Sequence, residues 1–251
     1  NTTGANNTSV GRASLTANTT ADNNTAVGAD VLASNTTGTQ NTAVGAFALD
    51  ANTTANNNTA IGYQALTDNT TGTQNIAVGT QALQNNATGD YNVSVGYRAL
   101  DANTTGDANT AMVYAALYTN STGNNNSAFG YFALRANTTG TQLVAVGGNS
   151  LKENTTASGN VAVGYNTLQA VTTGEANTAL GDSALYVNTG ASNTAVGNAA
   201  MVANTSGSYN TAVGQAALDA NTTGSYNTAI GEKAMTVSTN TTDCTSVGRG
   251  S

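Results

Sequence analysis

Side chains that could do chemistry are few in this sequence, and they do not gather into a known constellation. The chain has no His, which excludes His-dependent nucleophilic catalysis and His metal ligands. Its 13 Asp and Glu do not recur at one place, although Asp50, Asp101 and Asp219 stand at equivalent points of an internal repeat. Paired catalytic carboxylates need a cleft, which a regular repeat does not offer. We therefore predict that the protein is not an enzyme and holds no metal or cofactor.

The commonest motif that could be modified is an Asn followed two residues later by Thr or Ser. These Asn begin Asn-Thr-Thr, Asn-Ala-Thr, Asn-Ser-Thr or Asn-Thr-Ser, which are acceptor patterns for N-glycosylation at an exposed turn. One sugar on each repeat would cover one edge of the molecule. The alternative is that Asn serves turn geometry and hydrogen-bonded ladders. The candidate glycosylation sites are Asn1, Asn18, Asn35, Asn52, Asn69, Asn86, Asn103, Asn120, Asn137, Asn154, Asn204 and Asn221.

Tyrosine is the other patterned side chain. Exposed aromatic rings can stack on the sugar rings of a ligand, whereas rings in neighbouring repeats can also stack on one another and stabilise the fold. Both interpretations apply to the tyrosines that share one repeat position. The candidate ligand-stacking residues are Tyr63, Tyr97, Tyr114, Tyr131 and Tyr165. The single cysteine, Cys244, excludes an internal disulfide and is interpreted as a chance substitution or a crosslink between chains.

Composition argues against an ordinary globular domain. Only 8% of the 251 residues are charged, the net charge is −7, and the six Lys and Arg are scattered. A nucleic-acid partner needs clustered cations, so none is expected. No apolar run approaches the roughly 20 residues that span a bilayer. No signal peptide is recognisable, and the sequence starts in mid-pattern, so we expect a segment of a longer fibre.

An internal repeat with a step of 17 organises the whole chain. The motif Asn-Thr-Ala-Val-Gly at residues 24–28 returns at 41–45 and at 58–62, within the consensus N-T-A-V-G-x-x-A-L-x-x-N-T-T-G-x-x. One residue is missing near Asn188, and the step then resumes. We interpret residues 1–251 as one repeat domain of about 15 coils. The repeats start at residues 7, 24, 41, 58, 75, 92, 109, 126, 143, 160, 177, 193, 210, 227 and 244.

The repeat positions, numbered 1–17 from Asn24, predict an all-β fold. Asn-Thr-Thr-Gly breaks a helix, and the short stretch between the Gly at positions 5 and 15 is too short for a stable one. We predict a parallel β-solenoid with one coil per repeat, a corner at the position-5 Gly and a second turn at positions 12–15, where Gly and Asn tolerate positive φ. Positions 2 and 4 then face one way, and positions 3 and 5 the other.

Such a coil buries little apolar surface. We expect the core to consist of the aliphatic residue at position 4 and the Leu or Met at position 9, which is too little to offset the ordering of a whole coil. Stacked Asn and Thr ladders are one further source of stability, and burial against another chain is a second. The small residues at positions 3 and 5 would suit a close-packed interface, so we favour a side-by-side homotrimer. Alternatively, they simply fit a narrow coil.

The motif Asn-Thr-Ala-Val-Gly, followed by Ala-Leu and Asn-Thr-Thr-Gly, resembles the head repeats of trimeric autotransporter adhesins. It also resembles the shaft repeats of phage-like tail fibres. This resemblance covers the whole chain and implies a trimeric left-handed β-roll on a cell or virion surface. Autotransporter heads typically use shorter units than the repeat of this chain. The expected function is an extracellular structural fibre or adhesin shaft that associates with copies of itself.

Two alternative functions remain open on the sequence. The repeat is similar to ice-binding β-rolls, because Thr recurs at positions 13 and 14, and the tyrosines would suit a glycan-binding solenoid. The other alternative is a filament subunit that stacks end to end, since the chain starts at position 12 and ends at position 8. Candidate partners are therefore copies of the chain and surface glycans.

Overall fold

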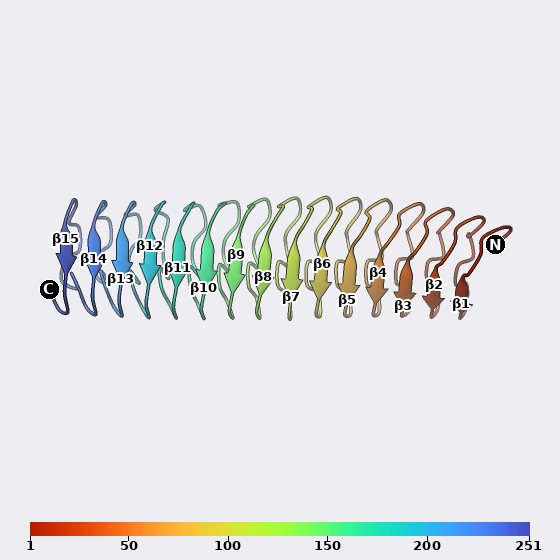
Figure 1. The fold of residues 1–251 in the computed structure, drawn as a ribbon, viewed down its shortest axis with the longest axis horizontal. Helices are drawn as coiled ribbons and strands as arrows, with labels where there is room; N and C mark the ends of the chain where they lie inside the picture. Colours follow the sequence, from red (N-terminus) through yellow and green to blue (C-terminus); the bar gives the residue numbers. More distant parts are fainter. The chain divides into compact units, whose positions relative to one another are not determined.

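The computed structural model describes residues 1–251 and is all-β, with 15 short parallel strands, one in each coil. The predicted parallel β-solenoid with one coil per repeat is confirmed (Figure 1). Residues 1–125 form one compact unit and residues 126–251 a second. The first unit contains β1 (Thr8–Val10), β2 (Thr25–Val27), β3 (Thr42–Val44), β4 (Thr59–Ile61), β5 (Ile76–Val78), β6 (Val93–Val95) and β7 (Thr110–Met112). The second contains β8 (Ser127–Phe129), β9 (Val144–Val146), β10 (Val161–Val163), β11 (Thr178–Leu180), β12 (Thr194–Val196), β13 (Thr211–Val213), β14 (Thr228–Ile230) and β15 (Thr245–Val247).

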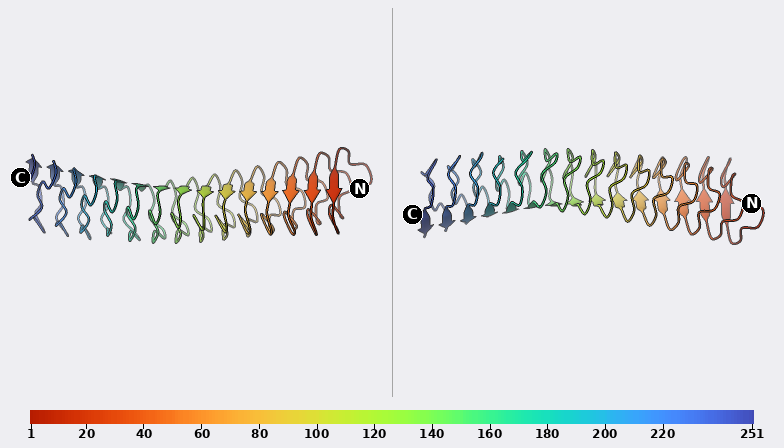
Figure 2. Two further views of the ribbon diagram at one scale, coloured as in Figure 1. Left: turned by 90° about the horizontal axis from the view of Figure 1, so that it is seen from below. Right: turned by 90° about the horizontal axis from the view of Figure 1, so that it is seen from above.

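Strands of neighbouring coils pair in repeat register within each unit. In the first unit Thr25 lies opposite Thr42, and each coil places its strand on the same side as its neighbours (Figures 1 and 2). In the second unit Thr178 lies opposite Thr194, although the step between them is one residue shorter. The missing residue is therefore absorbed in the turn at residues 187–190, and the strand register survives the deletion.

The position-5 glycines form the predicted corner. Their φ angles lie between 123° and 151°, a backbone conformation that residues with a Cβ rarely adopt. A Cβ added to Gly45 would also lie only 2.5 Å from the carbonyl oxygen of Gly62. Val113 takes this position in one coil with a φ of 89°, which is unusual for a β-branched residue.

The second turn differs from the sequence-based expectation. Left-handed residues were expected among positions 12–15, but the structure places them at positions 7, 9 and 17. One coil shows this at Asp30 (φ 55°), Leu32 (φ 47°) and Gln40 (φ 60°). The coil closes through single left-handed residues because each one reverses the direction of the backbone hydrogen bonds. The Asp30 N–H donates to the carbonyl of the preceding coil, and the Leu32 N–H donates to that of the following coil.

The side of each strand that points into the coil carries the small residue at position 3, which is mostly Ala. Ala43 at position 3 is fully buried, whereas Ile61 and Val213 at position 4 are 41% and 38% exposed. The expectation that position 4 forms the core and that position 3 forms an outer interface is therefore wrong. The interior is too narrow for a branched side chain on the strand, because the position-9 side chain and two buried Asn side chains occupy it. The predicted burial of the position-9 residue is confirmed, since Leu49 and most of its equivalents are fully buried.

Two ladders of buried Asn side chains fill the rest of the interior. At position 12, Asn52 Nδ2 donates to Asn35 Oδ1 in the preceding coil at 2.8 Å and to the Ala55 carbonyl at 3.2 Å. At position 1, Asn41 Oδ1 accepts from the Asn58 backbone N–H at 3.0 Å. Buried amides are stabilising only when their hydrogen bonds are made, and here each one joins its own coil to a neighbour. The ladders therefore supply cohesion that the thin apolar core lacks.

The position-12 ladder is interrupted where Val171 replaces Asn. As a result the buried Oδ1 of Asn154 in the preceding coil has no hydrogen-bond partner. An unsatisfied buried acceptor costs about 1–3 kcal/mol. The gap is thus a local weakness of the second unit.

Replacement of Val171 by Asn should stabilise the protein, because the new Nδ2 would donate to Asn154 Oδ1. We expect a gain of about 1 kcal/mol in the free energy of unfolding, measured by urea titration. The matched control, Val171→Ala, removes buried apolar volume without restoring the amide and should lower the urea midpoint. A V171N midpoint at or below that of the parent would contradict the ladder account.

Candidate functional surfaces

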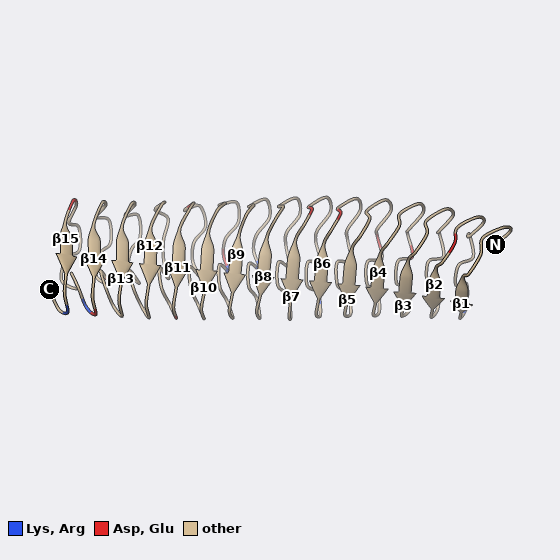
Figure 3. Ribbon diagram, viewed as in Figure 1, with Lys and Arg blue, Asp and Glu red and all other residues tan.

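The outer face of the strands is an uncharged surface made of positions 2 and 4. We call this the strand face. Within each unit, Thr, Ser or an aliphatic residue at position 2 alternates with an aliphatic residue, Met or Phe at position 4, and the equivalents lie opposite one another in neighbouring strands. Charged side chains are absent from every strand (Figure 3). Exposed aliphatic residues therefore recur on one face, coil after coil, which single scattered hydrophobic residues do not do.

The paired Thr at positions 13 and 14, which suggested ice binding, differ from each other in the structure. The position-13 side chain is mostly half-buried, and its hydroxyl donates to the next coil, as Thr36 Oγ1 does to the Thr53 carbonyl at 3.0 Å. The position-14 side chain, such as Thr37, is exposed. The second of these two rows is therefore the more exposed one. A regular Thr row also occurs at position 2 of the strand face, where Thr178, Thr194 and Thr211 align.

The Asn residues of the glycosylation patterns lie inside the coils. Asn1 is exposed, but all the other candidates are buried, from Asn18 to Asn221. Their Nδ2 atoms, to which a sugar would be joined, donate to the ladder, as in Asn103 to Asn86 Oδ1 at 2.8 Å. The expectation that the position-12 Asn is exposed is therefore wrong for every candidate except Asn1. The geometry is that of the alternative interpretation, in which Asn forms a hydrogen-bonded ladder.

Each candidate tyrosine packs against another residue, either an aromatic ring or a glycine, from the same coil or a neighbouring one. Tyr97 and Tyr114 stack face to face, with ring centroids 5.3 Å apart and an interplanar angle of 16°. Tyr63 meets the ring of Phe47 edge-on at 6.0 Å, and a Cβ on Gly148 would lie 3.3 Å from the ring of Tyr165. The remaining candidate, Tyr131, has its ring centroid 4.1 Å from that of Phe132.

Stacking along the coils uses the ring faces that a sugar would need. Tyr97 and Tyr114 are 44% and 42% exposed, and each turns one ring face toward the other. At position 17, Tyr209 and Tyr226 form a second stack, with ring centroids 5.0 Å apart. Both stacks match the interpretation in which tyrosine stabilises neighbouring coils. Ligand stacking stays a prediction.

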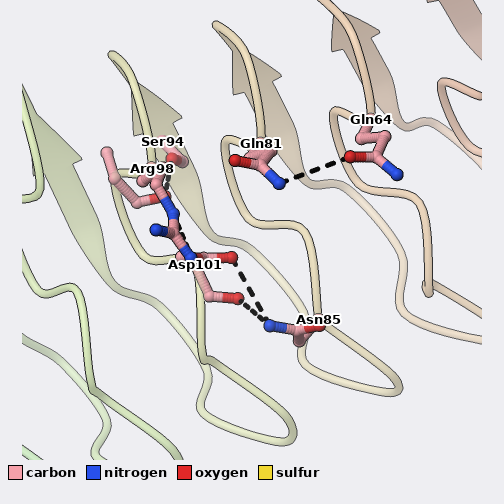
Figure 4. A network of polar contacts seen from close by, with 7 residues as sticks. Gln64, Gln81, Asn85, Ser94, Arg98 and Asp101 are labelled. Carbon is pink, nitrogen blue, oxygen red and sulfur yellow. Dashed lines mark hydrogen bonds and ion pairs between the residues drawn. The ribbon is translucent and has the colours of Figure 1, made fainter. Parts of the chain in front are cut away.

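Polar side chains of neighbouring coils form a small network in the first unit (Figure 4). Arg98 Nε lies 2.8 Å from Asp101 Oδ2, and Asn85 Nδ2 donates to the Asp101 carbonyl at 3.0 Å. The Arg98 guanidinium also lies over the Tyr118 ring, 4.9 Å from its centroid. Burial raises the pKa of the Asp101 carboxyl, and the neighbouring Arg98 offsets part of that rise. The charges of Arg98 and Asp101 compensate each other, and the hydrogen bond from Asn85 joins this pair to the preceding coil.

Sequence reasoning missed a third ladder at position 16. There the backbone N–H of one coil donates to a side-chain oxygen of the next, as Thr39 does to Asn56 Oδ1 and Thr73 to Asp90 Oδ1, both at 2.6 Å. In the second unit Ser208 and Ser225 repeat the pattern at 3.1 Å. The signal was available, because position 16 holds Asn, Asp, Ser or Thr in most coils. These residues are short acceptors whose oxygen stays close to the backbone.

Comparisons add no family. No family model matches the chain, and no curated protein matches it in sequence. No group of three or more Cys, Asp or Glu residues is arranged to hold a metal ion. The structure contains no helix with the length and apolar character needed to cross a membrane. The functional assignment therefore rests on the surfaces and on the repeat itself.

The ladder geometry predicts the glycosylation state of the folded protein. When the chain is secreted from a host that performs N-glycosylation, we expect a sugar on Asn1 at most, because transfer to a buried position-12 Nδ2 would remove one of its two donor hydrogens and force the side chain out of the ladder. Intact mass of the protease-resistant fraction checks this, with the variant Asn1→Gln as the control that should carry no sugar. Folded protein with sugar on Asn52 or Asn103 would contradict the structure.

Proposed function

We propose that this protein is a non-catalytic structural solenoid that associates side by side with copies of itself, most simply as a homotrimer, and serves as the shaft of an extracellular fibre or adhesin. The observation that carries the proposal is the strand face. Its apolar residues are left partly exposed in every coil, although the interior of each coil is complete without them. The repeat's resemblance to adhesin heads and tail-fibre shafts supports a place on a cell or virion surface.

The area of the strand face is large enough for a specific interface. Full burial of an aliphatic side chain hides roughly 60–120 Å² of apolar surface, so a position-4 residue about two-fifths exposed still offers about 25–50 Å². With its position-2 neighbour, each coil contributes on the order of 70 Å². The strands of the two units together offer roughly 1,000 Å² in each chain. A trimer divides this area between two neighbours, so each contact buries roughly 500 Å² a side, or about 1,000 Å² in total, which is the area that a biological interface should reach.

A second copy of the chain is the partner that fits this face best. The strand face repeats once per coil, at the strand spacing of about 4.8 Å. A partner must present the same spacing to make the same contact in every coil, and another copy does so by construction. The face carries no charge that would repel its own equivalent in a symmetric assembly.

A Lys on the strand face should therefore separate the copies without unfolding the coil. Val95 points outward from β6, so Val95→Lys can keep its ammonium group in water only if the face is open. We expect light scattering to give three times the 24.8 kDa chain mass for the parent protein and a single chain mass for V95K. Circular dichroism should be the same for both.

The matched control is Thr105→Lys, which adds the same charge to the same coil at an exposed position-14 turn, and it should remain trimeric. A parent protein that is a clean monomer would overturn the proposal. If that monomer also produced thermal hysteresis, the Thr and Val rows of the strand face would instead be an ice-binding surface.

A further inference from the structure

The strand face is not uniform, and its irregularities fall at position 2. Most strands carry Thr there, but β5 and β6 carry Ile76 and Val93, while β9 and β10 carry Val144 and Val161. In each pair the two residues lie directly opposite each other in the strand register. Ile76 is 41% exposed, and the other three are half-buried.

Each pair widens the aliphatic row into a patch four side chains in size. In the first unit, Ile76 and Val93 join Val78 and Val95 of the same two strands. In the second, Val144 and Val161 join Val146 and Val163. On either side of each patch, position 2 returns to Thr or Ser, as at Thr59 and Ser127. We call these the first-unit anchor (Ile76, Val93) and the second-unit anchor (Val144, Val161).

We propose that these two anchors fix the register in which copies of the chain associate, so that equivalent coils lie at the same level. This inference rests on the proposed self-association. A uniform ladder would allow neighbouring copies to slip by whole coils, because each slip reproduces nearly the same contacts. An interruption of the repeat removes that degeneracy, as a polar core residue does in a coiled coil.

A one-coil slip shows how the anchors act. If β5 of one copy faced β4 of the next, Ile76 would lie against Thr59, and Thr110 would lie against Val93. Each mismatch places a hydroxyl against an aliphatic side chain and leaves aliphatic surface poorly packed. The aligned register pairs aliphatic with aliphatic at both anchors. A rotation axis parallel to the stacking direction of the coils produces this alignment in a homotrimer.

The sharpest test moves one anchor and leaves the total composition of the strand face nearly unchanged. In the variant T25V/T42V/I76T/V93T, the first-unit anchor is shifted by three coils, while the second-unit anchor stays in place. The first-unit anchors of parent and variant then align only after a slip of three coils, whereas their second-unit anchors align without a slip. The four substituted residues are outward-facing, and Val and Thr are both favourable in strands, so the fold should tolerate the exchange.

The experiment mixes parent chains with variant chains that carry a mass tag, unfolds them in urea, refolds them together and counts mixed oligomers by native mass spectrometry. We expect each chain to form trimers alone, and mixed trimers to fall about tenfold below their statistical share. The control T20V/T37V adds two Val at the exposed position-14 turn and should mix with the parent statistically.

The outcomes separate the two proposals. Statistical mixing of parent and shifted variant, with both trimeric, would overturn the register inference while self-association stands. A monomeric parent would overturn the self-association on which the inference rests. A shifted variant that fails to fold is replaced by the milder V144T/T178V, which moves the second-unit anchor by one coil and must show the same depletion of mixed trimers.

Discussion

Hydrogen bonds between buried Asn side chains are the interaction on which this structure depends. A coil with one Leu and a few Ala at its centre buries too little apolar surface to offset the entropy of ordering. The ladders at positions 1 and 12 change that balance, because each amide satisfies carbonyl groups of its own coil and an amide or backbone group of the adjacent one. Polar groups thus do inside this coil what aliphatic packing does in an ordinary domain.

The same constraint explains why aliphatic residues lie outside. Two Asn side chains and one Leu leave room on the inner strand face only for Ala or Ser. The branched residue at position 4 is therefore displaced to the outer face, where it contributes little to a single chain. Regular aliphatic rows that do not pack inside the coil are the strongest indication of association with another surface of equal spacing. The narrow interior of the coil is thus the reason why the proposed function has an apolar outer surface to use.

Much of the fold follows from the sequence because the repeat averages out local ambiguity. The strand at Thr-Ala-Val, the corner Gly and the buried Leu were all predictable, since each recurs in nearly every coil. The inward face was not, because alternation identifies two faces without saying which is inside. The left-handed conformation of Leu32 could not be predicted either, since it opposes the intrinsic preference of Leu and is imposed by hydrogen bonds to both neighbouring coils. Among the candidate sites, the sequence motif identified a recurring Asn, but it could not show that this Asn is buried in most coils.

Hydrogen exchange of side-chain amides tests the central role of the ladders most directly. Asn75 and Gln74 are adjacent, but Asn75 is buried in the position-1 ladder and Gln74 is exposed. Nuclear magnetic resonance in D₂O should show that the Asn75 Nδ2 protons, like those of other ladder Asn residues, persist long after the Gln74 Nε2 protons have exchanged. Equal and rapid exchange at both residues would contradict an interior held together by amide ladders.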